Sequence, residues 1–166
     1  LDQSVQVYRI AANAENKVAT FGGSFGINYY LNNNITLNGN YTYNELIEKA
    51  EKDPIIPAYN TPKHKFNLGM IIKNIHLNKL YSALREFSFS LNYKWIDKYL
   101  YEGSPQFTGF IPQYDLLDIQ ISKELPEINA SLKIGSSNVL NNLHYEVYGG
   151  PYIGRMIYCS LLINVK

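Results

Sequence analysis

Strict alternation of apolar and polar residues over long stretches is the feature that most limits how this chain can fold. In the first stretch, one set of alternate positions is apolar or aromatic apart from a glycine: Phe21, Gly23, Phe25, Ile27, Tyr29 and Leu31. The intervening positions are mostly small or polar: Thr20, Gly22, Ser24, Gly26, Asn28 and Tyr30. Because successive side chains of a strand point to opposite faces, this pattern predicts a strand with one apolar face and one polar face.

The alternation also lasts longer than a typical soluble strand requires. It resumes at Ile35 and continues through Tyr43, and an ordinary strand stops after about five or six residues. A tilted strand needs about 9–11 residues to cross a bilayer. Long alternating strands with aromatic residues on the apolar face are typical of transmembrane β-barrels. We therefore expect an all-β chain of transmembrane antiparallel β-barrel strands.

Eight segments have an extended pattern, whereas helical periodicity is weak throughout. We expect strands over residues 4–11, 18–31, 35–48, 64–74, 86–99, 114–123, 129–137 and 153–166. At most a short helical turn is expected near residues 45–51 or 77–84. The pair Asn38-Gly39 is a common hairpin signal, but a turn there would divide an alternating stretch, so we expect it inside the strand.

The connections between these segments alternate in length. Asn32-Asn33-Asn34 and residues 126–129 are short and rich in turn formers, and the long loops are expected at 49–63, 100–113 and 138–152. Only the connection at 75–85 departs from this order. Short turns at one rim and long loops at the other are typical of outer-membrane barrels, whose long loops face outward.

Composition excludes several classes of protein. The net charge is +1, which gives no basic stripe for nucleic acid. A single cysteine excludes an internal disulfide framework and a cysteine-based zinc site. The 15 tyrosines suit a membrane boundary, because each ring is apolar and each hydroxyl is polar. The chain starts at Leu1 without a signal peptide, and we expect it to be a piece of a longer protein.

No catalytic or metal-binding constellation is evident. His64, His76 and His144 lack the close spacing of metal ligands. Asp115 and Asp118 would point to opposite faces of a strand, which makes them a poor carboxylate pair. We expect no enzyme activity, no metal and no cofactor.

The polar parity predicts a wet interior, which indicates a wide or plugged barrel. The outward, lipid-facing parity is expected to include Phe66, Leu68, Met70, Ile72, Phe87, Phe89, Leu91, Tyr93, Trp95, Leu117, Ile119, Ile121, Ile157, Cys159, Leu161, Ile163 and Val165. The inward parity is expected to include Lys65, Asn67, Gly69, Ser88, Ser90, Asn92, Lys94, Asp118, Gln120 and Ser122. Two alternatives stay open: a free-standing eight-strand barrel with a structural or adhesive role, and a soluble β-sandwich binding module.

Three segments resemble TonB-dependent outer-membrane receptors of the type found in Bacteroidetes. Residues 135–142 (GSSNVLNN) are similar to the G-x-x-N-L-x-N segment before the last strand of that family. Residues 144–155 look like the aromatic loop and the P-x-x-G-R start of that strand. Residues 56–68 (IPAYNTPKHKFNL) are similar to the approach to an earlier strand. The chain departs from the family at its end, where Val165 and Lys166 stand in place of a terminal aromatic residue.

The resemblance implies that residues 1–166 form the C-terminal third of a barrel of about 22 strands closed around a plug domain. The plug domain and the segment that contacts TonB would lie outside this chain. The implied function is active import of a scarce nutrient, such as a ferric siderophore, haem, cobalamin or a glycan, across the bacterial outer membrane. The implied partners are outer-membrane lipid, the plug and remaining barrel, TonB through the missing part, and the nutrient itself.

Aromatic and amide residues in the long loops are the candidates for ligand contact. Such side chains bind chelates and sugars by stacking and hydrogen bonding. Packing of loop against loop, or a place in the aromatic girdle, is the alternative for each of them. The candidates are Tyr59, Asn60, Tyr99, Tyr101, Phe107, Phe110, Tyr145 and Tyr148.

Overall fold

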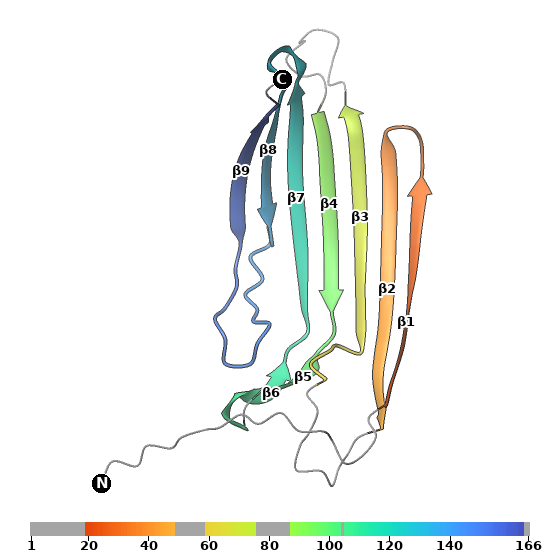
Figure 1. Ribbon diagram of the computed structural model, residues 1–166, viewed down its shortest axis with the longest axis vertical. Helices are drawn as coiled ribbons and strands as arrows, with labels where there is room; N and C mark the ends of the chain where they lie inside the picture. The colour runs from red at the N-terminus through yellow and green to blue at the C-terminus, as the bar shows by residue number, and fades with distance from the viewer. Residues whose placement is uncertain (1–18, 49–58, 76–86, 104, 165–166) are drawn as a thin grey trace, which may run out of the picture.

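Seven long strands form a single antiparallel sheet in the computed structural model, which describes residues 19–48, 59–75, 87–103 and 105–164 (Figure 1). The order across this sheet is β1-β2-β3-β4-β7-β8-β9. Its strands are β1 (Ala19–Tyr30), β2 (Ile35–Glu48), β3 (His64–Ile75), β4 (Phe87–Ile96), β7 (Tyr114–Leu125), β8 (Ala130–Ser137) and β9 (Met156–Ile163). A separate hairpin pairs β5 (Tyr99–Glu102) with β6 (Thr108–Ile111), and the 3-10 turns are η2 (Pro105–Phe107) and η3 (Pro126–Ile128).

The predicted all-β, antiparallel class is confirmed. The described part of the chain contains no α-helix. No helix in that part is long and apolar enough to cross a membrane. The sheet is open rather than closed within the described residues, with β1 and β9 as its two edges. The predicted strand at residues 4–11 lies outside the described residues.

The predicted turns and their arrangement are confirmed where the structure describes them. Asn32 Oδ1 accepts hydrogen bonds from the backbone amides of Asn34 and Ile35, both at 2.8 Å, and so closes the turn from β1 to β2. Asn129 ends η3 with a φ of 48°, a conformation that asparagine tolerates. Both short turns lie at one end of the sheet, and the long connections lie at the other (Figure 1). The connection at 76–86 is not described.

Asn38 and Gly39 lie inside β2, as expected, because they pair with Asn28 and Ile27 of β1. The expected helical turn near 45–51 is wrong in its described portion. Residues 45–48 continue β2 instead, since β1 extends alongside and pairs Phe21 with Glu45.

Two other boundaries differ from the prediction. The expected loop at 100–113 contains the β5–β6 hairpin, in which Tyr99 pairs with Ile111 and Tyr101 with Gly109. The strand expected over 86–99 therefore ends at Ile96, and its last residue belongs to that hairpin. The final strand begins at Met156 rather than 153, because Ile153 makes an isolated bridge with His144.

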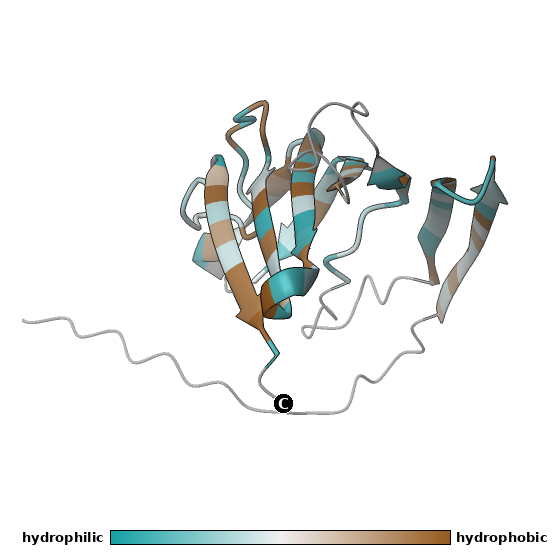
Figure 2. Ribbon diagram, turned by 90° about the horizontal axis from the view of Figure 1, so that it is seen from above, coloured by the Kyte–Doolittle hydropathy of each residue, from teal (hydrophilic) through white to brown (hydrophobic). Residues whose placement is uncertain are grey.

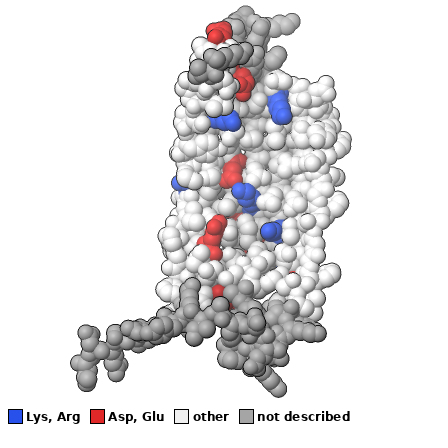
Figure 3. Space-filling model, in the orientation of Figure 1, with Lys and Arg blue, Asp and Glu red and all other residues white. Residues whose placement is uncertain are grey.

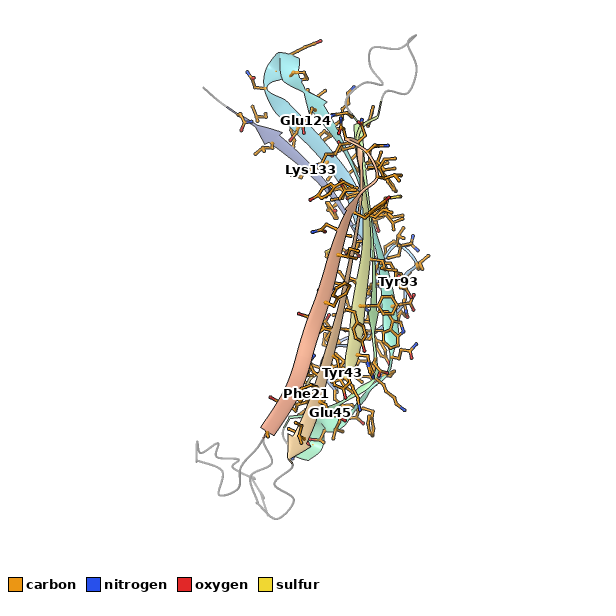
Figure 4. The ribbon with its side chains drawn as sticks, turned by 90° about the vertical axis from the view of Figure 1, so that its right-hand side faces the viewer. Phe21, Tyr43, Glu45, Tyr93, Glu124 and Lys133 are labelled. Atoms are coloured by element: carbon orange, nitrogen blue, oxygen red, sulfur yellow. The ribbon has the colours of Figure 1, made fainter. Side chains whose placement is uncertain are left out.

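The register aligns the apolar parity of every strand on one continuous face. Phe66 of β3 lies opposite Tyr41 on one side and Trp95 on the other, and Leu91 lies between Met70 and Ile119. Figure 2 shows the result as alternating hydrophobic and hydrophilic bands along the strands. In Figure 4 the sheet is bowed, with Tyr93 on its convex side. The apolar face is therefore convex, and the polar parity occupies the concave face.

This apolar face does not cover a dry core. Phe25 is 70% exposed and Leu161 is 58% exposed. Among the described residues, the buried hydrophobic side chains are Ile111, Tyr114 and Ala130 alone. An apolar surface of this extent needs a partner, because a sheet is stable when its hydrophobic face is covered.

Charged side chains collect on the concave face. Lys94 Nζ lies 3.0 Å from Asp118 Oδ2 across the β4–β7 pair, and Tyr158 donates a hydrogen bond to Gln120. Figure 3 views this face and shows acidic and basic groups in a narrow column along the middle of the sheet. Asp115 pairs with Trp95 and Asp118 with Asn92, so the two carboxylates lie on opposite faces as predicted.

Candidate functional site

The residues with the highest burial lie at the long-loop end of the sheet, where the β5–β6 hairpin meets the connection from β8 to β9 (Figure 1). This connection begins with Asn138, which is only 3% exposed and has a φ of 50°. Its backbone amide donates to Asp118 Oδ1 at 3.0 Å. Its side chain closes a ring with Asn142: Asn138 Nδ2 donates to the Asn142 carbonyl at 2.8 Å, and the Asn142 amide donates to Asn138 Oδ1 at 2.9 Å.

Asn142 continues this network toward β7. Its Nδ2 donates to the backbone oxygen of Asp115 at 3.0 Å and to the Asp115 carboxylate at 3.2 Å. His144 Nδ1 lies 3.1 Å from the Asn142 carbonyl, which acts as the acceptor and therefore places the proton on Nδ1. The buried His144 ring stacks on Tyr114 with centroids 4.4 Å apart. These contacts fix the path of the loop from Asn138 to His144.

A pocket of about 260 Å³ opens beside this network. Its walls combine aromatic rings with amide, imidazole and phenol groups, and no carboxylate, lysine or arginine contributes to them. Such a lining suits a neutral polar ligand that stacks on a ring and exchanges hydrogen bonds. The residues that line it are Pro112, Gln113, Tyr114, Asn142, Leu143, His144, Tyr145 and Tyr152.

Two exposed tyrosines form the outer part of this wall. Tyr145 and Tyr152 meet edge to face with centroids 5.4 Å apart, and Tyr145 also meets Tyr148 at 6.5 Å. The Tyr145 hydroxyl donates to the Phe110 carbonyl at 3.4 Å. Within the described residues, no cluster of three or more His, Cys, Asp or Glu side chains could hold a metal ion.

The eight residues predicted from sequence lie in this loop region, but only Tyr145 lines the pocket. Asn60 is used structurally: its amide donates to the Glu102 carbonyl at 3.1 Å and accepts from the Glu102 amide at 2.6 Å. The Tyr59 carbonyl accepts a hydrogen bond from the Thr61 hydroxyl at 2.7 Å.

Tyr99 ties the β5–β6 hairpin to the connection from β8 to β9. Its hydroxyl donates to the Glu146 carbonyl at 3.1 Å. Burial, followed by the nearby Glu146 and Tyr101 side chains, raises the pKa of the Tyr99 phenol. The phenol therefore stays protonated and able to donate this bond at neutral pH.

Phe107 and Tyr148 make a reciprocal contact with glycines of the opposite loop. The Tyr148 ring lies directly over Gly109, and the Phe107 ring lies over Gly149, where an added Cβ would come within 2.7 Å of Phe107 Cδ1. Gly149 has a φ of +77°, which glycine adopts without strain. The hairpin and the β8–β9 connection are thus held together by two rings seated on two glycines, while Phe110 remains 64% exposed.

Gly109→Ala is expected to detach the hairpin locally, because the new methyl group would overlap the Tyr148 ring. Overpacking of this kind costs about 1–3 kcal/mol. Faster hydrogen exchange at the amides of β5 and β6, with little change in the main sheet, would be the measured result. In the double variant Gly109→Ala/Tyr148→Ala the overlap is absent, so its exchange should match that of Tyr148→Ala. Unchanged exchange in Gly109→Ala would contradict the seated-ring contact.

Sequence reasoning missed most of the pocket wall. Asn142 and Tyr152 lie within the tail segments quoted above, but only their place in a motif was evident. Tyr114 was expected merely to begin a strand, and His144 to be an ordinary loop histidine. No protein-family model and no curated protein sequence matches this chain.

Proposed function

We propose that this chain is the C-terminal part of the β-barrel of a TonB-dependent outer-membrane receptor. In this proposal, the main sheet supplies barrel wall and the long loops supply an outward binding surface. The receptor imports a scarce nutrient, such as a ferric siderophore, haem, cobalamin or a glycan. The observation that carries the proposal is the exposed apolar face that runs without interruption across seven strands.

The strand lengths support a membrane setting for that face. β1, β3 and β7 each have 12 residues. Twelve residues rise about 40 Å at about 3.3 Å per residue, and a tilt of about 45° reduces this to roughly 28 Å. The apolar band of an outer-membrane barrel is about 25 Å tall.

The two open edges support a larger closed barrel. Each neighbouring pair in the seven-stranded sheet is antiparallel, so β1 and β9 run in the same direction. Joining them directly would require a parallel pair. An all-antiparallel barrel therefore needs an odd number of further strands between these edges, in agreement with the even totals of bacterial outer-membrane barrels.

The concave face supports a wide interior. It carries small and polar residues such as Ser90, Asn92 and Gln120 beside the Lys94–Asp118 ion pair. An eight-strand barrel is filled by its own inward side chains, and these small groups would fill it poorly. A plug domain inside a larger barrel would meet such a polar surface.

The import mechanism implied by the resemblance begins with capture at the outer loops. The pocket beside Tyr145 and Tyr152 offers rings and amides for this step. TonB, driven by the inner-membrane proton-motive force, would then displace the plug. Since the plug and the TonB-contacting segment are not among these residues, cells that carry residues 1–166 alone should show no energised uptake.

The membrane part of the proposal predicts that the purified chain needs an amphiphile to stay dispersed. We expect it to aggregate in buffer, and to become β-rich and protease-resistant when it is mixed with phospholipid vesicles. Sedimentation and circular dichroism in the two conditions measure this directly. A monodisperse, folded chain in detergent-free buffer would instead favour the soluble β-sandwich.

The second candidate is a free-standing eight-strand barrel with a structural or adhesive role. The observation in its favour is the strand predicted at residues 4–11, because one more strand would allow antiparallel closure of the seven described. The gene sequence upstream of Leu1 separates the two candidates. A plug-type domain there supports the receptor, and a signal peptide supports the small barrel.

A further inference from the structure

The apolar face of the sheet has a hollow over Gly39, between β1 and β3. The register sets two rows of three residues across β1, β2 and β3: Phe25, Tyr41 and Phe66 in one row, and Ile27, Gly39 and Leu68 in the next. Gly39 is the one position of these six without a side chain. The resulting groove has a volume of about 310 Å³, and the side chains of the other five line it.

The space over Gly39 is open to the exterior. A Cβ built on Gly39 would lie 3.4 Å from Leu68 Cδ2 and 3.6 Å from Ile27 Cγ2, which are ordinary contact distances. Ile27 is 56% exposed and Phe25 is 70% exposed, so the groove walls rise into the surroundings. A larger side chain at position 39 could therefore enter the groove without disturbing the strands.

One end of this groove leads to polar groups. The Tyr41 ring lines the groove, and its hydroxyl lies 2.7 Å from His64 Nδ1. Farther toward the long-loop end, Lys63 Nζ lies 2.7 Å from Glu45 Oε1 and 5.5 Å from the centroid of the Tyr43 ring. The side chains of Lys63 and Glu45 are 48% and 42% exposed, so both charges can be reached from outside. Figure 4 labels Tyr43 and Glu45 at this end of β2.

We propose that the groove binds one acyl chain of a phosphatidylethanolamine molecule, with its head group at Lys63 and Glu45. The inference rests on the proposed function, which places this face in a membrane. A linear hydrocarbon matches a groove lined by apolar and aromatic side chains, because it leaves no polar group unpaired there. The phosphate and ammonium groups of the lipid complement the adjacent positive and negative side chains.

The experiment is a lipid-retention measurement on the full chain. The chain is folded into phosphatidylethanolamine-containing vesicles, extracted in mild detergent and weighed by native mass spectrometry. We expect wild type to retain one phospholipid per chain. Gly39→Phe fills the groove and should lower retention by about tenfold or more, because the acyl methylenes lose their apolar contacts. Gly39→Leu, a smaller filler, should lower it in the same direction.

Ile157→Phe is the matched control. Ile157 lies on the same apolar face but on β9, and it is 73% exposed. The variant adds an aromatic ring to the face and leaves the groove unchanged, so it should retain lipid as wild type does.

Three results would overturn the lipid site. Equal retention in wild type and Gly39→Phe, or no retained lipid after verified insertion, would exclude it while leaving the barrel proposal intact. A second copy of the chain retained in place of lipid would identify a protein occupant. Failure of wild type to insert into vesicles would refute both the proposed function and the lipid site, and sedimentation before extraction identifies that case.

Discussion

Leu91→Arg is expected to block or severely weaken folding of this chain into a bilayer. Leu91 lies near the middle of β4, in the centre of the sheet, with Met70 and Ile119 on either side on the apolar face. An arginine on the lipid face near the midplane of an outer-membrane barrel costs about 2–4 kcal/mol. Urea titration of the chain in phospholipid vesicles, followed by tryptophan fluorescence, would measure the loss, since Trp95 is the only tryptophan.

Two matched variants decide what the apolar face contacts. Ser90→Arg places the same group on the concave face, one residue away, where we expect a change within about 0.5 kcal/mol. Leu91→Trp enlarges the side chain on the convex face. Lipid can yield to the larger ring, so this variant should fold normally, whereas a packed protein core would be destabilised by about 1–3 kcal/mol. A strong loss in Leu91→Trp would show that protein, not hydrocarbon, covers this face.

Asn138→Ala should destabilise the connection from β8 to β9 by about 3 kcal/mol or more. The substitution leaves the buried amide and carbonyl groups of Asn142 without their partner, at about 1–3 kcal/mol for each. It also places alanine at a φ of 50°, which adds about 1–2 kcal/mol. The His144 contact to the Asn142 carbonyl would loosen as well. Hydrogen exchange over residues 138–153 and protease sensitivity of the loop would measure this loss.

Asn138→Gly separates the two contributions. Glycine accepts the positive φ but lacks the amide, so its loss should be smaller than that of alanine by about 1 kcal/mol. Equal losses would mean that the backbone conformation contributes little. A wild-type exchange pattern in both variants would contradict the hydrogen-bonded ring as the support of the pocket.

The main sheet could be predicted from sequence because its signal is local. Alternation over 12 residues marks each long strand, and asparagine-rich or proline-bearing turns mark the short connections. The β5–β6 hairpin could not be found this way. Four-residue strands hold too few alternate positions, and the exchange of backbone hydrogen bonds between Tyr99 and Ile111 is set by the fold around them.

The candidate site was harder to predict than the sheet. Aromatic loop residues were selected by type, yet Phe107 and Tyr148 are occupied in holding two loops together. Tyr114 and His144 come from a strand end and a loop 30 residues apart, and their stacking depends on the register of β7 with β8. Residue type indicated the region, and the three-dimensional contacts chose the pocket wall.

The free edge of β1 has a consequence for assembly in the cell. Twelve residues there pair only with β2 within the described part of the chain, so one side offers a long row of backbone donors and acceptors. A nascent chain with such a border is a template for unwanted strand addition. We therefore expect it to require a chaperone or an insertion factor until its proper neighbour arrives, and to form fibrous or ladder-like oligomers when that neighbour is withheld.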